Sequence, residues 1–197
     1  MPHPVISANH VAVITGGASG IGLAAALRFA QAGMKVAIAD LGDDRLKAAA
    51  TKLSSAAPGG AADIMTAAVD VSRADAMAEL EASVAKRFGG ADILMNNAGI
   101  QPGSAMFGPA DNWQRILGVN LWGVINGTQL FAPGMITRGR PGLIINTGSK
   151  QGITTPPGNP AYNVAKAGVK AFTEALQHEL RNTEGCRIDA HLLIPGF

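Results

Sequence analysis

The sequence has almost no cysteine, and it lacks both a recognisable leader and a long apolar run. Cys186 is the only cysteine of 197 residues, which excludes an intramolecular disulfide and a cysteine-based metal site. The first residues lack the basic and apolar regions of a signal peptide. Arg28, Lys35 and Lys170 interrupt the apolar stretches before they reach the roughly 18 residues of a membrane span. We therefore expect a reduced, cytoplasmic protein with no membrane partner.

Charge is scarce as well. Charged residues make up 15% of the chain, and 16 Lys and Arg against 14 Asp and Glu leave a net charge of +2. This charge is too weak to indicate a nucleic-acid or membrane-surface partner. By contrast, 47% of the residues are hydrophobic, which excludes a disordered chain and is enough for a buried core. The length fits one domain.

Six short apolar runs alternate with five longer amphipathic segments. Several runs are apolar on both faces, as the strands of a parallel sheet covered by helices must be. The expected strands are Val11–Ile14, Lys35–Ala39, Ile64–Val69, Asp92–Met95, Leu143–Thr147 and Ile188–Ile194. The expected helices are Gly20–Ala32, Asp43–Ser54, Arg73–Arg87, Asn112–Thr137 and Ala161–Arg181. This alternation predicts one α/β domain over residues 1–197, a doubly wound parallel sheet in three αβα layers.

A glycine-rich turn joins the first expected strand to the first expected helix. It reads Thr15-Gly16-Gly17-Ala18-Ser19-Gly20-Ile21-Gly22. Such glycines let a pyrophosphate approach main-chain N–H groups at the positive end of a helix. A glycine-rich turn without a ligand is the simpler alternative. The strand before it and the helix after it favour a dinucleotide site.

Asp40 ends the second expected strand, close to the ~20-residue offset that separates the glycine turn from a ribose-binding carboxylate. A carboxylate there accepts hydrogen bonds from the ribose hydroxyls and repels a 2′-phosphate. Neither Ser19 nor Leu41 offers a cation for that phosphate. The alternative for Asp40 is a cap for the next helix. We predict NAD as the cofactor, with NADP less favoured.

The third and fourth expected strands also end in polar residues. Asp70-Val71 suits a contact with an adenine edge, although an aspartate before Ser72 is as easily a cap. Asn96-Asn97-Ala98-Gly99 combines two amides with two small residues. These residues could pin neighbouring strands and allow a ribose to approach closely, and the structural role is favoured over direct chemistry.

Tyr162 and Lys166 lie four residues apart in a strongly helical pattern, so they share a helix face. A cation beside a phenol stabilises the phenolate and makes tyrosine a usable acid or base near neutral pH. A surface tyrosine beside a solvated lysine is the commonplace alternative. Ser149, after the fifth expected strand, and Asn120, whose amide could hold a water, strengthen the catalytic interpretation. Singly, Ser149 is typical of a turn and Asn120 of a polar site within a helix.

In order and spacing, these motifs resemble those of the short-chain dehydrogenase/reductase family, in its single-domain branch. The resemblance runs from Val11 to Phe197 and rests on Thr15–Gly22, Asp70, Asn96–Gly99, Asn120, Ser149, Tyr162, Lys166 and Pro195-Gly196. Singly the motifs are weak, but jointly they are specific. The resemblance implies a Rossmann fold and an NAD(P)-dependent oxidoreductase. Such an enzyme moves a hydride between nicotinamide and a secondary alcohol or ketone without a metal.

The resemblance also implies a role for each motif. Tyr162 would be the catalytic acid and base, Ser149 would hold the reacting oxygen, and Lys166 would support the phenolate and bind the nicotinamide ribose. Asn120 would hold a water that links Lys166 to solvent. The implied cofactor-binding residues are Gly16, Ser19, Gly20, Ile21, Gly22, Asp40, Asp70, Val71, Asn97, Ala98, Gly99, Tyr162, Lys166, Pro195 and Gly196.

The substrate is less well defined. The candidate pocket residues mix apolar and amide groups without an arginine that could clamp an acid: Gln101, Pro102, Gln151, Thr155, Pro156, Pro157 and Asn159. We therefore expect a neutral secondary alcohol or ketone as the small-molecule partner. The rival interpretation is a non-catalytic dinucleotide-binding sensor or scaffold of the same fold. The joint presence of Asn120, Ser149, Tyr162 and Lys166 argues against it.

Two expectations concern the rest of the molecule. Members of the resembling family continue past the Pro-Gly pair with a threonine, a helical lid and a final strand, so we expect domain 1–197 to be incomplete at its carboxyl end. The alternative is a polypeptide that ends at Phe197. By analogy with the family, the apolar faces of Asn112–Thr137 and Ala161–Arg181 predict a homodimer or homotetramer, unless these faces pack on the sheet.

Overall fold

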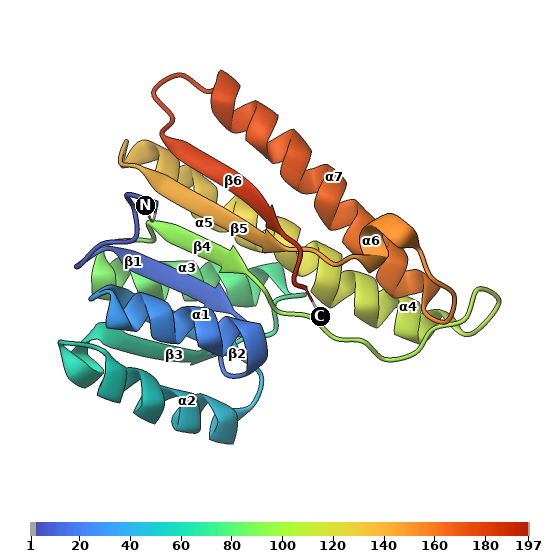
Figure 1. Ribbon diagram of the computed structural model, residues 1–197, viewed down its shortest axis with the longest axis horizontal. Helices are drawn as coiled ribbons and strands as arrows, with labels where there is room; N and C mark the ends of the chain where they lie inside the picture. Colours follow the sequence, from blue (N-terminus) through green and yellow to red (C-terminus); the bar gives the residue numbers. More distant parts are fainter. Residues whose placement is uncertain (1–2, 197) are drawn as a thin grey trace.

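A parallel six-stranded sheet forms the centre of the computed structural model, which describes residues 3–196. The strands lie in the order β3-β2-β1-β4-β5-β6 (Figure 1). Their bounds are β1 Val11–Thr15, β2 Lys35–Asp40, β3 Ile64–Ala68, β4 Ile93–Asn96, β5 Gly142–Thr147 and β6 Ile188–Leu193. The order reverses between β1 and β4, which opens a crevice at the carboxyl ends of these strands. The predicted fold class, a doubly wound Rossmann sheet, is confirmed.

Helices cover both faces of this sheet, in three layers (Figure 1). Helices α1 and α2 pack on one face, and α3, α5 and α7 pack on the other. Helix α4 packs against the first turns of α7. The bounds are α1 Gly20–Gln31, α2 Asp43–Ala56, α3 Ala74–Phe88, α4 Ala110–Leu117, α5 Gly123–Thr137 and α7 Pro160–Asn182.

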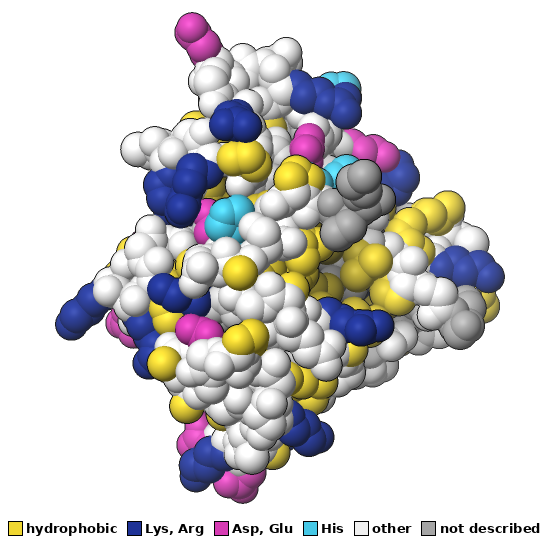
Figure 2. All heavy atoms as spheres, turned by 60° about the vertical axis from the view of Figure 1, so that its left-hand side comes forward, with side chains coloured by type: hydrophobic (Ala, Val, Ile, Leu, Met, Phe, Trp, Pro, Cys, Tyr) yellow, Lys and Arg dark blue, Asp and Glu magenta, His cyan; other side chains and the backbone are white. Residues whose placement is uncertain are grey.

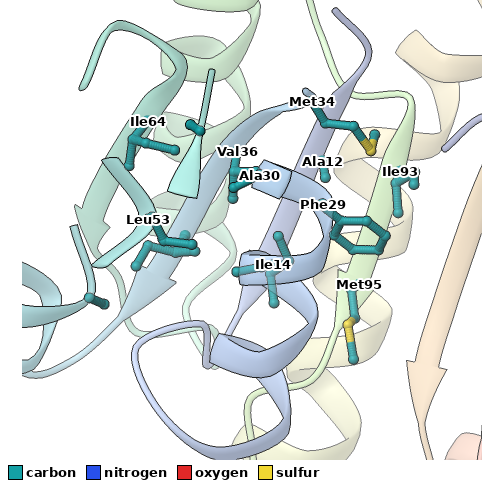
Figure 3. Close-up of a cluster of buried hydrophobic side chains, with 14 of the residues drawn as sticks. Ala12, Ile14, Phe29, Ala30, Met34, Val36, Leu53, Ile64, Ile93 and Met95 are labelled. Atoms are coloured by element: carbon teal, nitrogen blue, oxygen red, sulfur yellow. The ribbon is translucent and has the colours of Figure 1, made fainter. Parts of the chain in front are cut away.

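The core between the sheet and helices α1 and α2 explains the apolar runs of the sequence. Ile14 and Val36, from β1 and β2, are fully buried beneath Phe29 of α1 and Leu53 of α2 (Figure 3). All five residues of β1 are buried, because each face of this central strand is covered by helices. Burying one such side chain contributes about 1.5–3 kcal/mol. A strand buried on both faces therefore has no polar alternation.

The structure differs from the predicted elements in two places that matter for the site. The predicted helix Asn112–Thr137 is not continuous, because Gly118–Trp122 form a π-helical turn, η2, between α4 and α5. A short helix, α6 (Gln151–Thr154), follows β5 where a plain loop was expected. A 3-10 turn, η1 (Gly60–Asp63), precedes β3. A π turn adds one residue and shifts the face of the helix that follows it. The largely apolar run Val119–Ile125 shows no break in periodicity that would reveal this shift.

The surface carries mixed charge. On the face that Figure 2 shows, Lys and Arg side chains are interspersed with Asp and Glu, and a hollow lined largely by hydrophobic side chains opens among them. None of the described helices combines the length and the apolar character that crossing a membrane requires.

A buried polar network ties the two strands beneath the crevice to the helices behind them. The Asn96 amide of β4 donates to Asn146 Oδ1 of β5 at 2.9 Å and to Thr128 Oγ1 of α5 at 3.3 Å. The Asn146 amide in turn donates to Thr173 Oγ1 of α7 at 3.0 Å. All four side chains are buried. Such a network favours one arrangement of these elements, because breaking one hydrogen bond leaves a buried polar group without a partner.

We predict that Asn146→Ala lowers the free energy of unfolding by about 2 kcal/mol, because it removes an acceptor from Asn96 and a donor from Thr173 in a dry interior. Urea unfolding followed by circular dichroism measures this loss. The control is Asn182→Ala, at the exposed end of α7, which should change stability by no more than about 0.5 kcal/mol. Equal effects of the two substitutions would contradict the structural role of the network.

Candidate active site

A cavity of about 580 Å³ opens at the carboxyl ends of the strands, where the strand order reverses. Its size is typical of a small-molecule site, and the place is the usual ligand crevice of an open α/β sheet. Most of the predicted site residues border it: Gly16, Ser19, Gly20, Ile21, Asp40, Asp70, Val71, Asn97, Ala98, Gly99, Ser149, Tyr162, Lys166, Pro195 and Gly196. Gly22 and Asn120 lie behind its wall.

The glycine-rich turn leaves open space at one end of the cavity. Gly20 has a φ of +52°, and a Cβ atom there would meet nothing within 4 Å. Ser19 is the N-cap of α1, but its side chain makes no capping hydrogen bond and borders the cavity. The N–H groups of a helix end without a side-chain cap suit an anion such as a pyrophosphate. Gly22 supports the turn from behind, because a Cβ atom there would overlap the Gly16 carbonyl oxygen.

Asp40 stands at the end of β2 with its carboxylate on the cavity wall. Its two oxygens accept hydrogen bonds from the main-chain N–H groups of Ala18, at 3.1 Å, and Leu41, at 2.8 Å. The guanidinium of Arg45, in the first turn of α2, forms an ion pair with it at 3.2 Å and also borders the cavity. Arg45 was not predicted from the sequence, because it lies five residues beyond Asp40 and reaches the carboxylate from the first turn of α2.

The polar residues that follow β3 and β4 form hydrogen bonds with other groups of the protein. The Asp70 carboxylate accepts hydrogen bonds from the N–H, at 2.9 Å, and the hydroxyl, at 2.7 Å, of Ser72. The Asn97 amide donates to the carbonyls of Thr15 and Gly16, and its oxygen accepts from the Thr147 hydroxyl at 3.3 Å. Asn97 thus joins the ends of β1 and β5 across β4. Both residues still border the cavity.

Tyr162 and Lys166 lie on the first two turns of α7 and border the opposite end of the cavity. The Lys166 ammonium is buried, donates to the Thr147 carbonyl at 2.7 Å and lies 5.7 Å from the centre of the Tyr162 ring. Burial lowers the pKa of Lys166 from 10.5 to about 8. The helix spacing therefore delivers the predicted pair of phenol and amine to one site.

Ser149 follows β5 and is held by the short helix α6. Its hydroxyl accepts from the Gln151 N–H at 3.2 Å, and its carbonyl accepts from the Gly152 N–H at 3.0 Å. A Cβ atom on Gly152 would lie 2.5 Å from the carbonyl carbon of Lys166. Glycine at this position lets α6 pack directly on the backbone of α7, so Ser149 and Lys166 are fixed relative to each other.

Asn120 lies in the π turn η2, fully buried. Its amide nitrogen donates to the Ile100 carbonyl and its oxygen accepts from the Ile100 N–H, both at 2.8 Å. The side chain therefore holds the loop after β4 in place. Its predicted role as the holder of a relay water stays a prediction.

Four of the seven expected substrate residues line two different surfaces, whereas Pro102, Gln151 and Asn159 line neither. Gln101 borders the cavity beside Ser149 and Tyr162. Thr155, Pro156 and Pro157 instead line a second, mostly apolar groove with Ser104. Their shared position after β5 suggested one pocket, but the turn of α6 directs them away from the first cavity.

Comparison with known proteins agrees with this geometry. The profile of the family described as short chain dehydrogenase matches residues 10–197. The chain belongs to this family. It is 39% identical over 171 residues to a protein named SadH from Mycobacterium tuberculosis, covering 86% of this chain and 60% of SadH. It is 36% identical over 196 residues to 3beta-hydroxysteroid dehydrogenase 2 of Eggerthella lenta, covering 98% of this chain and 73% of that protein.

Solved structures of short-chain dehydrogenases superpose closely on this chain. One from Burkholderia phymatum, in complex with NAD, has a TM-score of 0.92 at 34% identity and covers 99% of this chain and 68% of its own. L-Sorbose reductase from Gluconobacter frateurii, complexed with NADPH and L-sorbose, has a TM-score of 0.88 at 33% identity, with coverages of 98% and 72%. This chain therefore spans about two thirds of the length of these relatives.

We predict that Lys166→Met changes how stability depends on pH. The unfolded chain keeps the lysine proton up to about pH 10.5, and the folded chain keeps it only up to about pH 8. Folding therefore releases a proton between these values, and the stability of the wild type should rise with pH relative to the variant by up to about 1.4 kcal/mol per pH unit. Urea unfolding at a series of pH values measures it.

The control for this experiment is Lys52→Met, which removes an exposed lysine of α2. Its stability should follow the wild-type curve between pH 8 and pH 10.5. A Lys166→Met curve that runs parallel to the wild-type curve would show that the buried amine keeps its ordinary pKa.

Proposed function

We propose that this short-chain dehydrogenase is an NAD(P)-dependent oxidoreductase that interconverts a secondary alcohol and a ketone, with Tyr162 as the acid and base. One observation carries the proposal. Tyr162, Ser149 and the buried Lys166 border the same cavity as the open glycine-rich turn. A protein that only bound a dinucleotide would have no need of a phenol beside a buried amine.

The cavity fits a dinucleotide in its chemistry. The uncapped end of α1 and the space before Gly20 would hold the pyrophosphate, and the Asp40 carboxylate would accept from the ribose hydroxyls. Lys166 would contact the second ribose. When bound, the nicotinamide supplies or accepts the hydride, and the residues of the chain need only manage the proton and the oxygen of the substrate.

The proton and the oxygen define the roles of three side chains. In reduction the Tyr162 phenol donates its proton to the substrate oxygen, and in oxidation the phenolate takes it back. The Ser149 hydroxyl donates a hydrogen bond to the same oxygen and stabilises the charge that develops there. The Lys166 ammonium, present below about pH 8, favours the phenolate by its charge.

The substrate that we propose is a neutral secondary alcohol or ketone. Support comes from the lining of the cavity that Ser149 and Tyr162 border, because it includes the amide of Gln101 and the apolar residues Ile100 and Val119. An amide can orient a hydroxyl or a carbonyl, whereas apolar neighbours favour an uncharged carbon skeleton.

We predict that Tyr162→Phe lowers kcat for ketone reduction by about 10²- to 10⁴-fold, because it removes the proton donor. The NADH dissociation constant, measured by nicotinamide fluorescence, should stay within about twofold, because the phenol is one of many cofactor contacts. A panel of neutral ketones and charged keto acids identifies the substrate class. As a control, Glu174→Gln alters an exposed ion pair farther along α7 and should leave kcat unchanged. NADH binding without any turnover that depends on Tyr162 would favour a sensor or scaffold.

For the cofactor, we propose that NAD is preferred over NADP. The Asp40 carboxylate on the cavity wall supports this preference, because it would repel a 2′-phosphate. Arg45 limits the preference, because its guanidinium lies 3.2 Å from the same carboxylate. A cation in this place can attract the phosphate once the carboxylate is gone.

We predict that Asp40→Ala lowers kcat/KM for NAD and raises it for NADP, each by about tenfold, which corresponds to one charge-assisted hydrogen bond. Steady-state kinetics with both cofactors measure the ratio. Asp44→Ala is the matched control, because Asp44 lies beside Arg45 in the first turn of α2 but is fully exposed and pairs with Lys47. An unchanged cofactor ratio in Asp40→Ala would place the ribose elsewhere.

We further propose that the protein assembles as a homodimer or homotetramer. Trp122 and Val164 support this, because they are 55% and 49% exposed on η2 and on α7. The cytoplasmic location expected from the sequence stays a prediction.

A further inference from the structure

We propose that Asn159 and Ser104 are positioning residues for Tyr162. They join the loop that follows β4 to the first turn of α7, the helix that carries Tyr162 and Lys166. The inference rests on the proposed function, because it concerns the place of the residue that we take to be the acid and base.

The first turn of α7 is capped by the residue directly before it, Asn159, and by Ser104 from a distant loop. Pro160 has no N–H, so the first donors are Ala161 and Tyr162. The Ser104 hydroxyl accepts from the Ala161 N–H at 3.0 Å, and Asn159 Oδ1 accepts from the Tyr162 N–H at 3.4 Å. The same hydroxyl donates to Asn159 Oδ1 at 2.5 Å. The main chain of Tyr162 is therefore part of a cap that Asn159 and Ser104 complete together.

The other end of Asn159 reaches the loop. Its amide nitrogen donates to the Pro102 carbonyl at 3.0 Å. Two residues earlier, Ile100 is held on both its N–H and its carbonyl by Asn120. Between these attachments lies Gln101, which borders the cavity. The Asn159 amide thus connects the loop that carries Gln101 to the first turn of α7, which carries the Tyr162 phenol.

This cap sets α7 apart from the other helices. Among the α-helices of residues 3–196, α7 is the one whose N-cap side chain accepts a hydrogen bond from its first turn. The cap matters for chemistry because a reacting group that is misplaced by ~1 Å can lose about 10²-fold in rate. A first turn that loosens would carry the Tyr162 ring with it, whereas the glycine-rich end of the cavity would not move.

Substitutions at the two residues test this in the full chain. Asn159→Ala and Ser104→Ala should each lower kcat for ketone reduction by about 10- to 100-fold, with the NADH dissociation constant within about twofold of the wild type. Because the two residues form one hydrogen-bonded cap, kcat of the double variant should fall no further than that of the worse single variant. Asn159→Asp keeps an oxygen for Tyr162 and Ser104 and loses the hydrogen bond to Pro102. Because the cap positions Tyr162, kcat of this variant should recover to within about fivefold of the wild type.

A matched control separates the helix from the loop. The Asn112 amide donates to the Gly103 carbonyl at 2.6 Å, so it holds the same loop from α4 and takes no part in the cap of α7. Asn112→Ala should leave kcat within about twofold of the wild type. Losses that multiply in the double variant, NADH affinity that falls in step with kcat, or a loss in Asn112→Ala equal to that in Asn159→Ala would each overturn the positioning role.

Amide hydrogen exchange gives a readout that needs no turnover. Asn159→Ala and Ser104→Ala should each speed exchange in both segments, 100–106 and 160–166, because either change opens the shared cap. Faster exchange that is confined to 100–106 in Ser104→Ala, or to 160–166 in Asn159→Ala, would overturn the proposal. If the wild type binds NADH but shows no turnover that depends on Tyr162, the proposed function fails and this experiment decides the positioning role by itself. If turnover is present and both substitutions leave kcat intact, the proposed function stands and the positioning role fails.

Discussion

The hydrogen bond from the Lys166 ammonium to the Thr147 carbonyl holds α7 against the end of β5, and the candidate site depends on it. The amine is buried there, and this burial lowers its pKa to about 8. Below that pH the ammonium keeps its charge close to the Tyr162 ring, in a place that water reaches poorly. The close packing of Gly152 on the Lys166 backbone then holds Ser149 at the wall of the cavity that Tyr162 also borders. Phenol, hydroxyl and amine are thus fixed by contacts at one strand end.

Asparagine side chains join the other strand ends and the loop around this site. Asn96 and Asn146 join β4 to β5 beneath the cavity, and Asn97 joins β1 to β5 at its edge. Asn120 and Asn159 hold the irregular loop that follows β4. An amide suits these places because it offers a donor and an acceptor without a charge, so it can satisfy two main-chain groups in a dry setting. Regular secondary structure ends at the crevice, and side chains replace its hydrogen bonds there.

Some elements of this fold can be predicted from the sequence and others cannot, for physical reasons. The bounds of all six strands were predicted to within one residue, because the central strands are apolar runs buried on both faces and the edge strands β3 and β6 alternate buried or half-buried residues with exposed ones. The π turn η2 was missed because the run around it is largely apolar, so the shift of the helix face leaves no visible break in the pattern. Helix α6 is a single turn stabilised by packing on α7, and its sequence carries no pattern of its own. Arg45 was missed because a helix first turn, not a sequence neighbour, brings it to Asp40.

The sequence by itself determined the alternation of strands and helices, the glycine-rich turn, and the spacing that places Tyr162 and Lys166 on one helix face. Local periodicity and backbone freedom suffice for these features, because each depends on residues close together in the chain. Only the tertiary structure decided which side chains meet at the crevice. It placed Arg45 beside Asp40, turned Thr155–Pro157 toward a separate groove, and joined Ser104 to Asn159 across the loop. These contacts depend on how segments far apart in the sequence pack together, and short-range sequence patterns do not predict that packing.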